Sequence, residues 1–589
     1  MKLSPRLARL SHGASVLALV AMAGCATTRP VTTPMANPKA LPGGPAAAID
    51  VPVISRPDGE TPAWWFRNGA AEAARIDAQA HSQGARAKNV IVFLGDGMSI
   101  PTIAAAHVLA GQQKGVDGES YRLSFEKFPY SALSRTYETD QQTPDSAGTM
   151  TAIMTGVKTR AGYIGISQVP RRQDCAGSRG QELVTALELA AAAGMATGAV
   201  TTTRITHATP AATYGHLPER NWEVDSEIPA AERAKGCKDF AAQLVDFPLG
   251  NGLTVAMGGG RSAFMPKSMR DPEYPQKSGQ RTDGRDLTAE WKARHPDGAY
   301  VWNEAQFKAL DLSRTQHVLG LFEPSHMKFE HDRPGDTAGE PSLAEMTASA
   351  IKVLAKSPNG FFLMVEGGRI DHALHAGNAY RALTETIAMA DAVQAALDNT
   401  DTADTLIIVT ADHSHTMTFG GYPARGNPML GLVRGMTDSY DDEAEAGIAH
   451  DATGKPYTTL NFANGPGYTG ASNEQPEGSK RYPHNPKTMM PATKGRPDLS
   501  TIDTGHPDYM QESLVPLKSE THGGEDVAIF ANGPGAAALH GEIEENTIFH
   551  VIVQHAPALR AQLCKLGSCD ANGVPVNRPT YQDWLHEAP

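Results

Sequence analysis

The chain has 589 residues, of which 40% are hydrophobic, so it can bury a core larger than that of an average single domain. Its formal net charge of -13 excludes nucleic acid as the main partner, because binding a phosphate backbone requires a basic face. A small phosphate ester remains compatible with this charge, since bound metal ions can invert the local field of an acidic protein.

Residues 1–24 resemble a lipoprotein signal peptide, with an early basic region and then an apolar run too short to span a bilayer. The run ends in Met22-Ala23-Gly24-Cys25, which resembles a bacterial lipobox although Met22 stands where leucine is usual. We therefore expect cleavage before Cys25 and lipidation of its thiol; ordinary signal cleavage with an unmodified cysteine is the alternative. We therefore expect an exported, lipid-anchored protein. Aspartate directly after the lipidated cysteine would favour retention in the inner membrane, so Ala26 favours the outer membrane.

The rest of the chain alternates between strand-like and helical patterns. Residues 25–60 are rich in Pro, Ala, Thr and Gly and are interpreted as a flexible tether. Apolar runs at 90–94, 198–201, 361–365 and 405–410 predict strands, and patterns at 63–80, 181–193 and 379–397 predict helices. This alternation predicts an α/β fold, a three-layer α/β/α sandwich with a large, mostly parallel central sheet. Residues 61–575 would form one catalytic domain, with 425–510 as a rim insertion and 576–589 as a tail.

Metal-ligand types follow each of these predicted strands almost at once. They are Asp96; His207 and Thr209; Glu366, Asp371 and His375; and Asp412, His413 and His415. Each group alone is more often a turn, a cap or a surface pair, but the repetition at successive strand ends changes that reading, because ligands gather at the carboxyl ends of parallel strands. Carboxylate with imidazole suits zinc, and carboxylate with hydroxyl suits magnesium.

A nucleophile candidate lies in the stretch Pro144-Asp145-Ser146-Ala147-Gly148-Thr149, which precedes a helical pattern. Ser146 would stand at a helix N-terminus, where free N–H groups and the helix dipole favour an anion. The alternative is a serine that only caps the helix.

Four motifs together resemble the alkaline phosphatase family, in the same order along the chain. They are residues 144–159, Phe361 to His372, Thr410-Ala411-Asp412-His413-Ser414-His415, and Glu520-Thr521-His522-Gly523-Gly524-Glu525-Asp526. The resemblance runs from about residue 62 to 570 and is closer to the animal-type branch than to the enterobacterial one. It implies hydrolysis of phosphate monoesters through a phosphoserine intermediate, and a homodimer.

The resemblance also implies roles for individual residues. Asp371, His375 and His522 would hold one zinc ion; Asp96, Asp412 and His413 a second; and Asp96, Thr209 and Glu366 magnesium, with His207 nearby through water. Ser146 would be the nucleophile, Arg220 would grip phosphate, Asp145 would orient Arg220, and His372 and His415 would line the site.

Two further features follow from the animal-type pattern. Glu273, the Phe322 carbonyl, Glu323 and Glu340 fall where these enzymes bind calcium, although the family has aspartate at the last position; a set of exposed acids is the alternative. The four cysteines after Cys25 are an even number in an exported chain, which suggests disulfides. The resemblance implies the pairs Cys175–Cys237 and Cys564–Cys569.

Two rival functions can be weighed on the sequence. A phosphodiesterase or sulfatase of related fold is the first, but sulfatases need a modifiable cysteine where this chain has Ser146, and such diesterases usually lack the magnesium site and the arginine. The second is an inactive surface lipoprotein that only binds phosphate or metal, against which Ser146, Arg220 and three sets of ligands speak.

Overall fold

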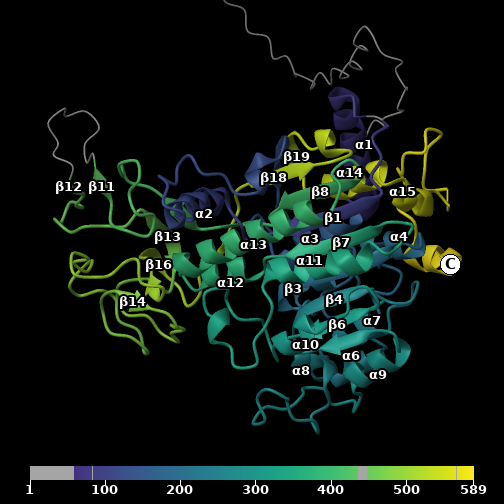
Figure 1. The fold of residues 1–589 in the computed structure, drawn as a ribbon, viewed down its shortest axis with the longest axis horizontal. Helices are drawn as coiled ribbons and strands as arrows, with labels where there is room; N and C mark the ends of the chain where they lie inside the picture. The colour runs from purple at the N-terminus through teal and green to yellow at the C-terminus, as the bar shows by residue number, and fades with distance from the viewer. Residues whose placement is uncertain (1–58, 83, 436–446, 566, 589) are drawn as a thin grey trace, which may run out of the picture. The chain divides into compact units, whose positions relative to one another are not determined.

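The computed structural model describes residues 59–82, 84–435, 447–565 and 567–588 (Figure 1). The predicted signal peptide, Cys25 and nearly all of the predicted tether lie outside these residues. The body is built on a ten-stranded sheet in which β18 alone runs antiparallel to its neighbours. Across the sheet the strands are β19 (Gly541–Glu544), β2 (Tyr130–Arg135), β18 (Val527–Asn532), β8 (Thr405–Thr410), β1 (Asn89–Leu94), β7 (Phe361–Glu366), β3 (Ala196–Arg204), β4 (Val255–Gly259), β6 (Val318–Leu321) and β5 (Ala299–Val301).

Helices cover both faces of this sheet. One face packs against α1 (Pro62–Ala80), α3 (Ser146–Thr155), α4 (Ala186–Ala192), α7 (Phe240–Val245), α9 (Leu287–Arg294), α14 (Thr547–His555) and α15 (Pro557–Cys564). The other packs against α2 (Ile100–Gln113), α11 (Leu343–Leu354), α12 (Arg369–His375) and α13 (Ala379–Asn399). In Figure 1, α11 and α13 lie across the viewer's side of the sheet.

The alternation of side chains along the central strands explains the two faces. In β1, Val90, Val92 and Leu94 belong to one buried cluster, whereas Ile91 and Phe93 belong to the other. A parallel strand covered on both sides reads as a continuous apolar run, because neither set of side chains meets water. The three-layer α/β/α sandwich is thus confirmed, and the four apolar runs in the sequence are the adjacent strands β8, β1, β7 and β3.

Local capping determines where one predicted helix begins. The pattern at 181–193 forms only α4, because Thr185 accepts a hydrogen bond from the Glu188 N–H while the Glu188 carboxylate accepts one from the Thr185 N–H. This capping box ends the irregular segment and starts the helix at Ala186.

The described residues between 425 and 510 contribute no strand to the central sheet. Within the described part of this range, short strands pair in small separate sheets: β11 (Arg434–Gly435) with β12 (Gly447–Ile448), β13 (Leu460–Gly465) with β10 (Met417–Phe419) and β16 (Ser513–Pro516), and β14 (Lys480–Arg481) with β15 (Tyr509–Met510). The region is labelled at the left of Figure 1.

The C-terminal segment differs from the expected tail. It ends in α16 (Tyr581–Glu587), whose Tyr581 and Trp584 are buried against the core. The Tyr581 hydroxyl donates to Glu188 Oε1 at 2.6 Å. Two aromatic side chains spaced three apart supply enough apolar area to dock one short helix.

Both expected disulfides are present. Cys175–Cys237 and Cys564–Cys569 have Cα–Cα distances of 5.7 and 5.0 Å. Disulfides persist in oxidising compartments, which indicates export from the cytoplasm. Among the described residues, no helix combines the length and apolar content needed to span a bilayer.

Candidate active site

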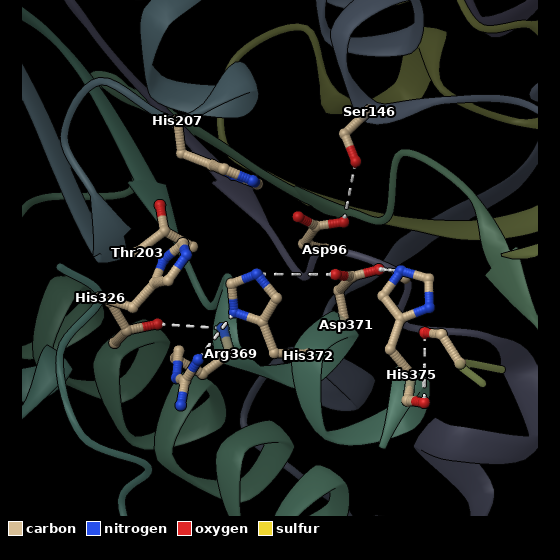
Figure 2. A network of polar contacts seen from close by, with 12 residues as sticks. Asp96, Ser146, Thr203, His207, His326, Arg369, Asp371, His372 and His375 are labelled. Atoms are coloured by element: carbon tan, nitrogen blue, oxygen red, sulfur yellow. Dashed lines mark hydrogen bonds and ion pairs between the residues drawn. The ribbon is translucent and has the colours of Figure 1, made fainter. Parts of the chain in front are cut away.

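The candidate ligands of the first two clusters meet beyond the carboxyl ends of three neighbouring strands. Asp96 follows β1, Asp371 and His375 follow β7 on α12, and Asp412 follows β8. Figure 2 shows Asp96, Asp371 and Ser146 converging from separate elements. Asp371 and His375 share one face of α12, as their spacing of four predicts.

The first cluster consists of Asp371, His375, His415 and His522, whose ligand atoms all lie within 4.8 Å of one another. The Nε2 atoms of His375, His415 and His522 lie 3.2, 2.8 and 3.4 Å from Asp371 Oδ1. Three imidazoles facing one carboxylate oxygen are a donor set typical of zinc. The structure therefore unites the three residues predicted for the first zinc and adds His415, which was predicted to line the site.

Outer hydrogen bonds orient these imidazoles. His375 Nδ1 faces the Glu520 carbonyl at 2.5 Å, and His522 Nδ1 faces the Pro144 carbonyl at 2.6 Å. Because a carbonyl oxygen only accepts, each Nδ1 carries the proton and each Nε2 lone pair is left for the cluster. The Glu520 carboxylate also pairs with His415 Nδ1 at 2.5 Å. Glu520 lies in one of the sequence motifs, but its position there does not predict this role.

The second cluster surrounds Ser146, the first residue of α3. Its Oγ lies 3.0 Å from His413 Nε2 and 3.4 Å from Asp96 Oδ1. His413 Nε2 is in turn 3.3 Å from Asp96 Oδ1 and 3.6 Å from Asp412 Oδ2. Asp145, and not Ser146, occupies the N-cap position of α3, so the Ser146 hydroxyl remains directed at the cluster.

The third cluster brings Asp96, His207 and Glu366 together, with ligand atoms within 4.8 Å of one another. Glu366 Oε2 accepts hydrogen bonds from the hydroxyls of Thr201 and Thr203, the latter at 3.1 Å. These two threonines lie on β3, two residues apart, and were not predicted as site residues. Thr209 is fully buried in α5 (Ala208–Ala211), beside the Glu366 carboxylate.

Arg220 and Asp145 form the predicted pair beside these clusters. Arg220 Nη1 contacts Asp145 Oδ1, and Asp145 Oδ2 accepts from the Gly162 N–H at 2.8 Å. Burial alone would raise the pKa of Asp145, but Arg220 and the Gly162 N–H hold it below its usual value. Arg220 Nη2 donates to His207 Nε2 at 3.1 Å, so the His207 proton resides on Nδ1.

Burial and mutual repulsion make the ionised forms of these clustered carboxylates costly, because little positive charge lies near them. Burial, followed by the neighbouring Asp412, Asp371 and Glu366 carboxylates, raises the pKa of Asp96 well above its usual value. Burial also raises the pKa of Asp412 to about 6 and that of Glu366 to about 7. Buried oxygens without a hydrogen bond remain on three of these side chains: Asp96 Oδ2, Asp412 Oδ2 and Glu366 Oε1. Orphaned buried acceptors of this kind fit divalent cations, which would satisfy both their charge and their lone pairs.

Two residues that the sequence did not predict for the site, Arg369 and His326, contact the His372 ring. Its Nδ1 accepts from Arg369 Nη1 at 2.9 Å, so its proton resides on Nε2, which faces Asp371 (Figure 2). The His326 ring packs against the rings of His372 and His207, with centroids 4.2 and 5.4 Å away. Arg369 lies inside the motif Phe361 to His372. His326 comes from the loop after β6, and no sequence pattern around it predicts a place in the site.

The structure brings some of the predicted calcium ligands together, with one residue that was not predicted. Glu273, Glu323 and Asp336 form a fourth cluster with ligand atoms within 4.8 Å of one another. Glu340 is buried nearby, and its Oε1 accepts from the Lys328 N–H at 2.7 Å. Phe322, which directly follows β6 and precedes Glu323 in the chain, is buried. Asp336 was not predicted, because it lies in the segment where the chain departs from the family pattern.

Comparisons with known proteins agree with this geometry. The alkaline phosphatase family profile matches residues 87–558. The tissue-nonspecific alkaline phosphatase of Gallus gallus is 45% identical over 477 residues, which cover 80% of this chain and 84% of that protein. The Homo sapiens isozyme is 43% identical over 476 residues, which cover 80% and 84%. The crystal structure of Thermus thermophilus alkaline phosphatase shares the fold, with a TM-score of 0.54 and 24% identity over 81% of this chain and 95% of that one.

The order of the motifs, the buried ligand clusters and the length of these matches point the same way. The chain belongs to the alkaline phosphatase family of metal-dependent phosphomonoesterases.

Proposed function

We propose that Ser146 is the nucleophile of this phosphatase and forms a phosphoserine intermediate. The observation that carries the proposal is the position of its hydroxyl, which is buried at the start of α3 and lies within 3.4 Å of both His413 and Asp96. The helix N-terminus favours the phosphate group at the same place.

We propose two zinc ions and one magnesium ion for the three catalytic clusters. Asp371, His375 and His522, with His415 beside them, offer nitrogen and oxygen donors for one zinc; Asp96, Asp412 and His413 offer them for the other. Asp96, Thr209 and Glu366 offer only oxygens, which suits magnesium, and the Nδ1–H of His207 would donate to a water molecule there. Bound at these places, the cations would lower the pKa of the serine hydroxyl and stabilise charge on the entering and leaving oxygens.

The chain's own groups would perform the remaining work. The Ser146 hydroxyl donates to Asp96 Oδ1, so this carboxylate orients the hydroxyl, whose proton passes to water as Oγ attacks phosphorus. The P–O bond to the alcohol breaks, and the leaving alkoxide takes up a proton from water to become the alcohol. Arg220, held by Asp145, offers a planar fork to two phosphoryl oxygens. Water then cleaves the phosphoserine, which releases phosphate and restores the Ser146 hydroxyl.

The substitution Ser146→Ala tests this role. We expect it to abolish the trapping of radioactive phosphate on the protein after an acid quench, with zinc content unchanged, because serine is not among the proposed ligands. Ser178→Ala, at a buried serine that donates to the Cys175 carbonyl, is the matched control and should label normally. Phosphoserine formation, or near-parental turnover, by Ser146→Ala would contradict the proposal.

Monoesters are the substrates that this site favours over diesters or sulfate esters. Arg220 offers positive charge and hydrogen bonds, and magnesium at the third cluster would offer further positive charge, to oxygens that a monoester leaves free and a diester covers. Rates for an aryl phosphate, its diester and its sulfate, measured on one purified sample, would test the choice. A diester or sulfate rate equal to the monoester rate would contradict it.

Three finer properties are proposed from the resemblance. Calcium would bind the fourth cluster, where oxygen donors predominate. A homodimer would cover apolar side chains left exposed near α2 and β2, namely Ile100, Tyr130 and Leu133. Lipidation of Cys25 would anchor the exported protein to a membrane, probed by detergent partition of the parent and Cys25→Ser proteins; wholly soluble parent protein would contradict it.

A further inference from the structure

The fourth cluster contains more negative charge than its hydrogen bonds satisfy. Glu323 follows β6, and Glu273 and Asp336 reach it from two other loops. The Asp336 side chain is 1% exposed, and neither of its carboxylate oxygens accepts a hydrogen bond from any residue that the structure describes. The Glu273 Oε1 and Glu340 Oε2 atoms are also buried without a partner. These free lone pairs, aimed at one another, indicate a place for a cation.

A cation of the protein itself already reaches this place. Lys328 Nζ lies 2.8 Å from Glu323 Oε1 and 3.7 Å from Asp336 Oδ1. It also lies 3.0 Å from the Tyr274 hydroxyl, which is 3.1 Å from the same Glu323 oxygen. The ammonium group therefore occupies lone pairs that a divalent ion would need.

The other nearby basic group, Arg261, does not neutralise the negative charge of the cluster. Arg261 is fully buried and pairs with Asp271 at 2.9 Å and with Glu273 at 3.0 Å. Its charge is thus shared between two carboxylates, one of them outside the cluster. Lys328 is the group that meets Glu323 and Asp336, and removing it would leave both without a counter-ion in the described part of the chain.

We propose that Lys328 is an internal counter-ion of the fourth cluster, and that a divalent cation binds there only when the ammonium group moves out. The side chain is suited to this exchange: it is 34% exposed, and its four-carbon stem can turn toward solvent. The affinity for calcium is then lowered by the fraction of molecules in which the ammonium group fills the site. The inference rests on the proposed fourth metal site but not on the proposed role of Ser146.

Lys328→Met tests the exchange, because it removes the charge and keeps the stem. Protein loaded with zinc and magnesium would be titrated with calcium chloride, and binding followed by calorimetry and by the rise in Tm. We expect the calcium concentration at half-saturation to fall at least about tenfold relative to the parent. Lys328→Arg, which keeps the charge, should bind no more tightly than the parent.

Lys277→Met is the matched control. Lys277 lies over the same Tyr274 ring, with Nζ 4.4 Å from the centroid, and has no ion pair with the cluster among the described residues. It should leave calcium binding at the parental value. Lys328→Met combined with Asp336→Asn should lose the gained affinity, which would locate the ion at this cluster.

Two outcomes would overturn the inference. Equal half-saturation in the parent and Lys328→Met proteins would show that the ammonium group does not compete. Absence of calcium binding in both would remove the fourth metal site itself, while phosphate trapping on Ser146 would still report separately on the proposed mechanism. If Lys328→Met does not fold, Lys328→Gln carries the same prediction, because its amide can still donate to Glu323 without a charge.

Discussion

The catalytic clusters and the fourth cluster both lie beyond the carboxyl ends of strands in one sheet, yet their negative charge is balanced differently. In the catalytic clusters the nearby guanidinium, Arg220, is already paired with Asp145. Asp96 and Asp412 keep buried oxygens that accept no hydrogen bond from the described residues. In the fourth cluster a flexible lysine reaches the carboxylates directly.

With the proposed metal ions bound, one sheet would carry one acidic site that depends on metal and another that tolerates its absence. A buried carboxylate needs a counter-charge, since unpaired burial is costly. A metal ion supplies it tightly but must come from solution. A lysine side chain supplies it within the chain and can be displaced, which would make the fourth site a weaker and more adjustable one.

The largest expected effect comes from Asp371, whose Oδ1 faces three imidazoles of the first cluster. Asp371→Asn removes the charge and keeps the shape, so it should empty the first zinc site and lower kcat/KM by roughly 10³-fold. Zinc content by elemental analysis and the phosphatase rate measure this. Glu323→Gln, the corresponding change in the fourth cluster, should keep its zinc; loss of zinc in both variants would break the comparison.

A smaller effect is expected from pH in protein stripped of metal. Burial alone would lower the pKa of His415, but Glu520 and Asp371 raise it to about 10, so its protonated form stabilises the fold and this contribution is lost as pH rises toward 10. Burial raises the pKa of Glu340 to about 9, so the cost of ionising it in the fold grows as pH rises from about 4.5 to about 9.

Both groups act in the same direction above neutral pH. The Tm of the stripped protein should therefore be roughly 5 °C lower at pH 9.5 than at pH 7.5. Zinc should remove the part of this decline that comes from His415, because the bound ion replaces the proton on the imidazole, whereas the part from Glu340 should remain. Scanning calorimetry of stripped and zinc-loaded samples measures it, and equal declines in both would mean that the catalytic clusters do not depend on metal for their charge balance.

The smallest expected effect concerns His207 in the third cluster. His207→Asp adds a carboxylate where the chain has a neutral imidazole, so magnesium should half-saturate at a concentration roughly tenfold lower. Stimulation of the purified enzyme by added magnesium should shrink accordingly. Activity against free magnesium, with zinc held constant, measures this, and His540→Asp outside the site is the control. Identical half-saturation in the parent and His207→Asp proteins would contradict it.

Much of the site could be predicted from sequence because its parts are local. The runs at 90–94, 361–365 and 405–410 are buried on both faces, so they are continuously apolar, and each is followed at once by its ligands. Asp371 and His375 share a helix face by spacing alone. The order of the motifs then predicted the fold class, and it assigned most ligands to the cluster in which the structure places them.

Tertiary structure alone decided the contacts between segments far apart in the chain. His522 is oriented by the Pro144 carbonyl, 378 residues away, and no periodicity encodes that meeting. The loop between β6 and α11 brings His326 behind His372 and Lys328 into the fourth cluster, and makes Asp336 a ligand candidate beside the predicted Glu340. Such a loop has no repeating pattern, because its path is determined by what its side chains meet. Sequence therefore determined which chemistry is available at the strand ends, and packing decided which charges balance it.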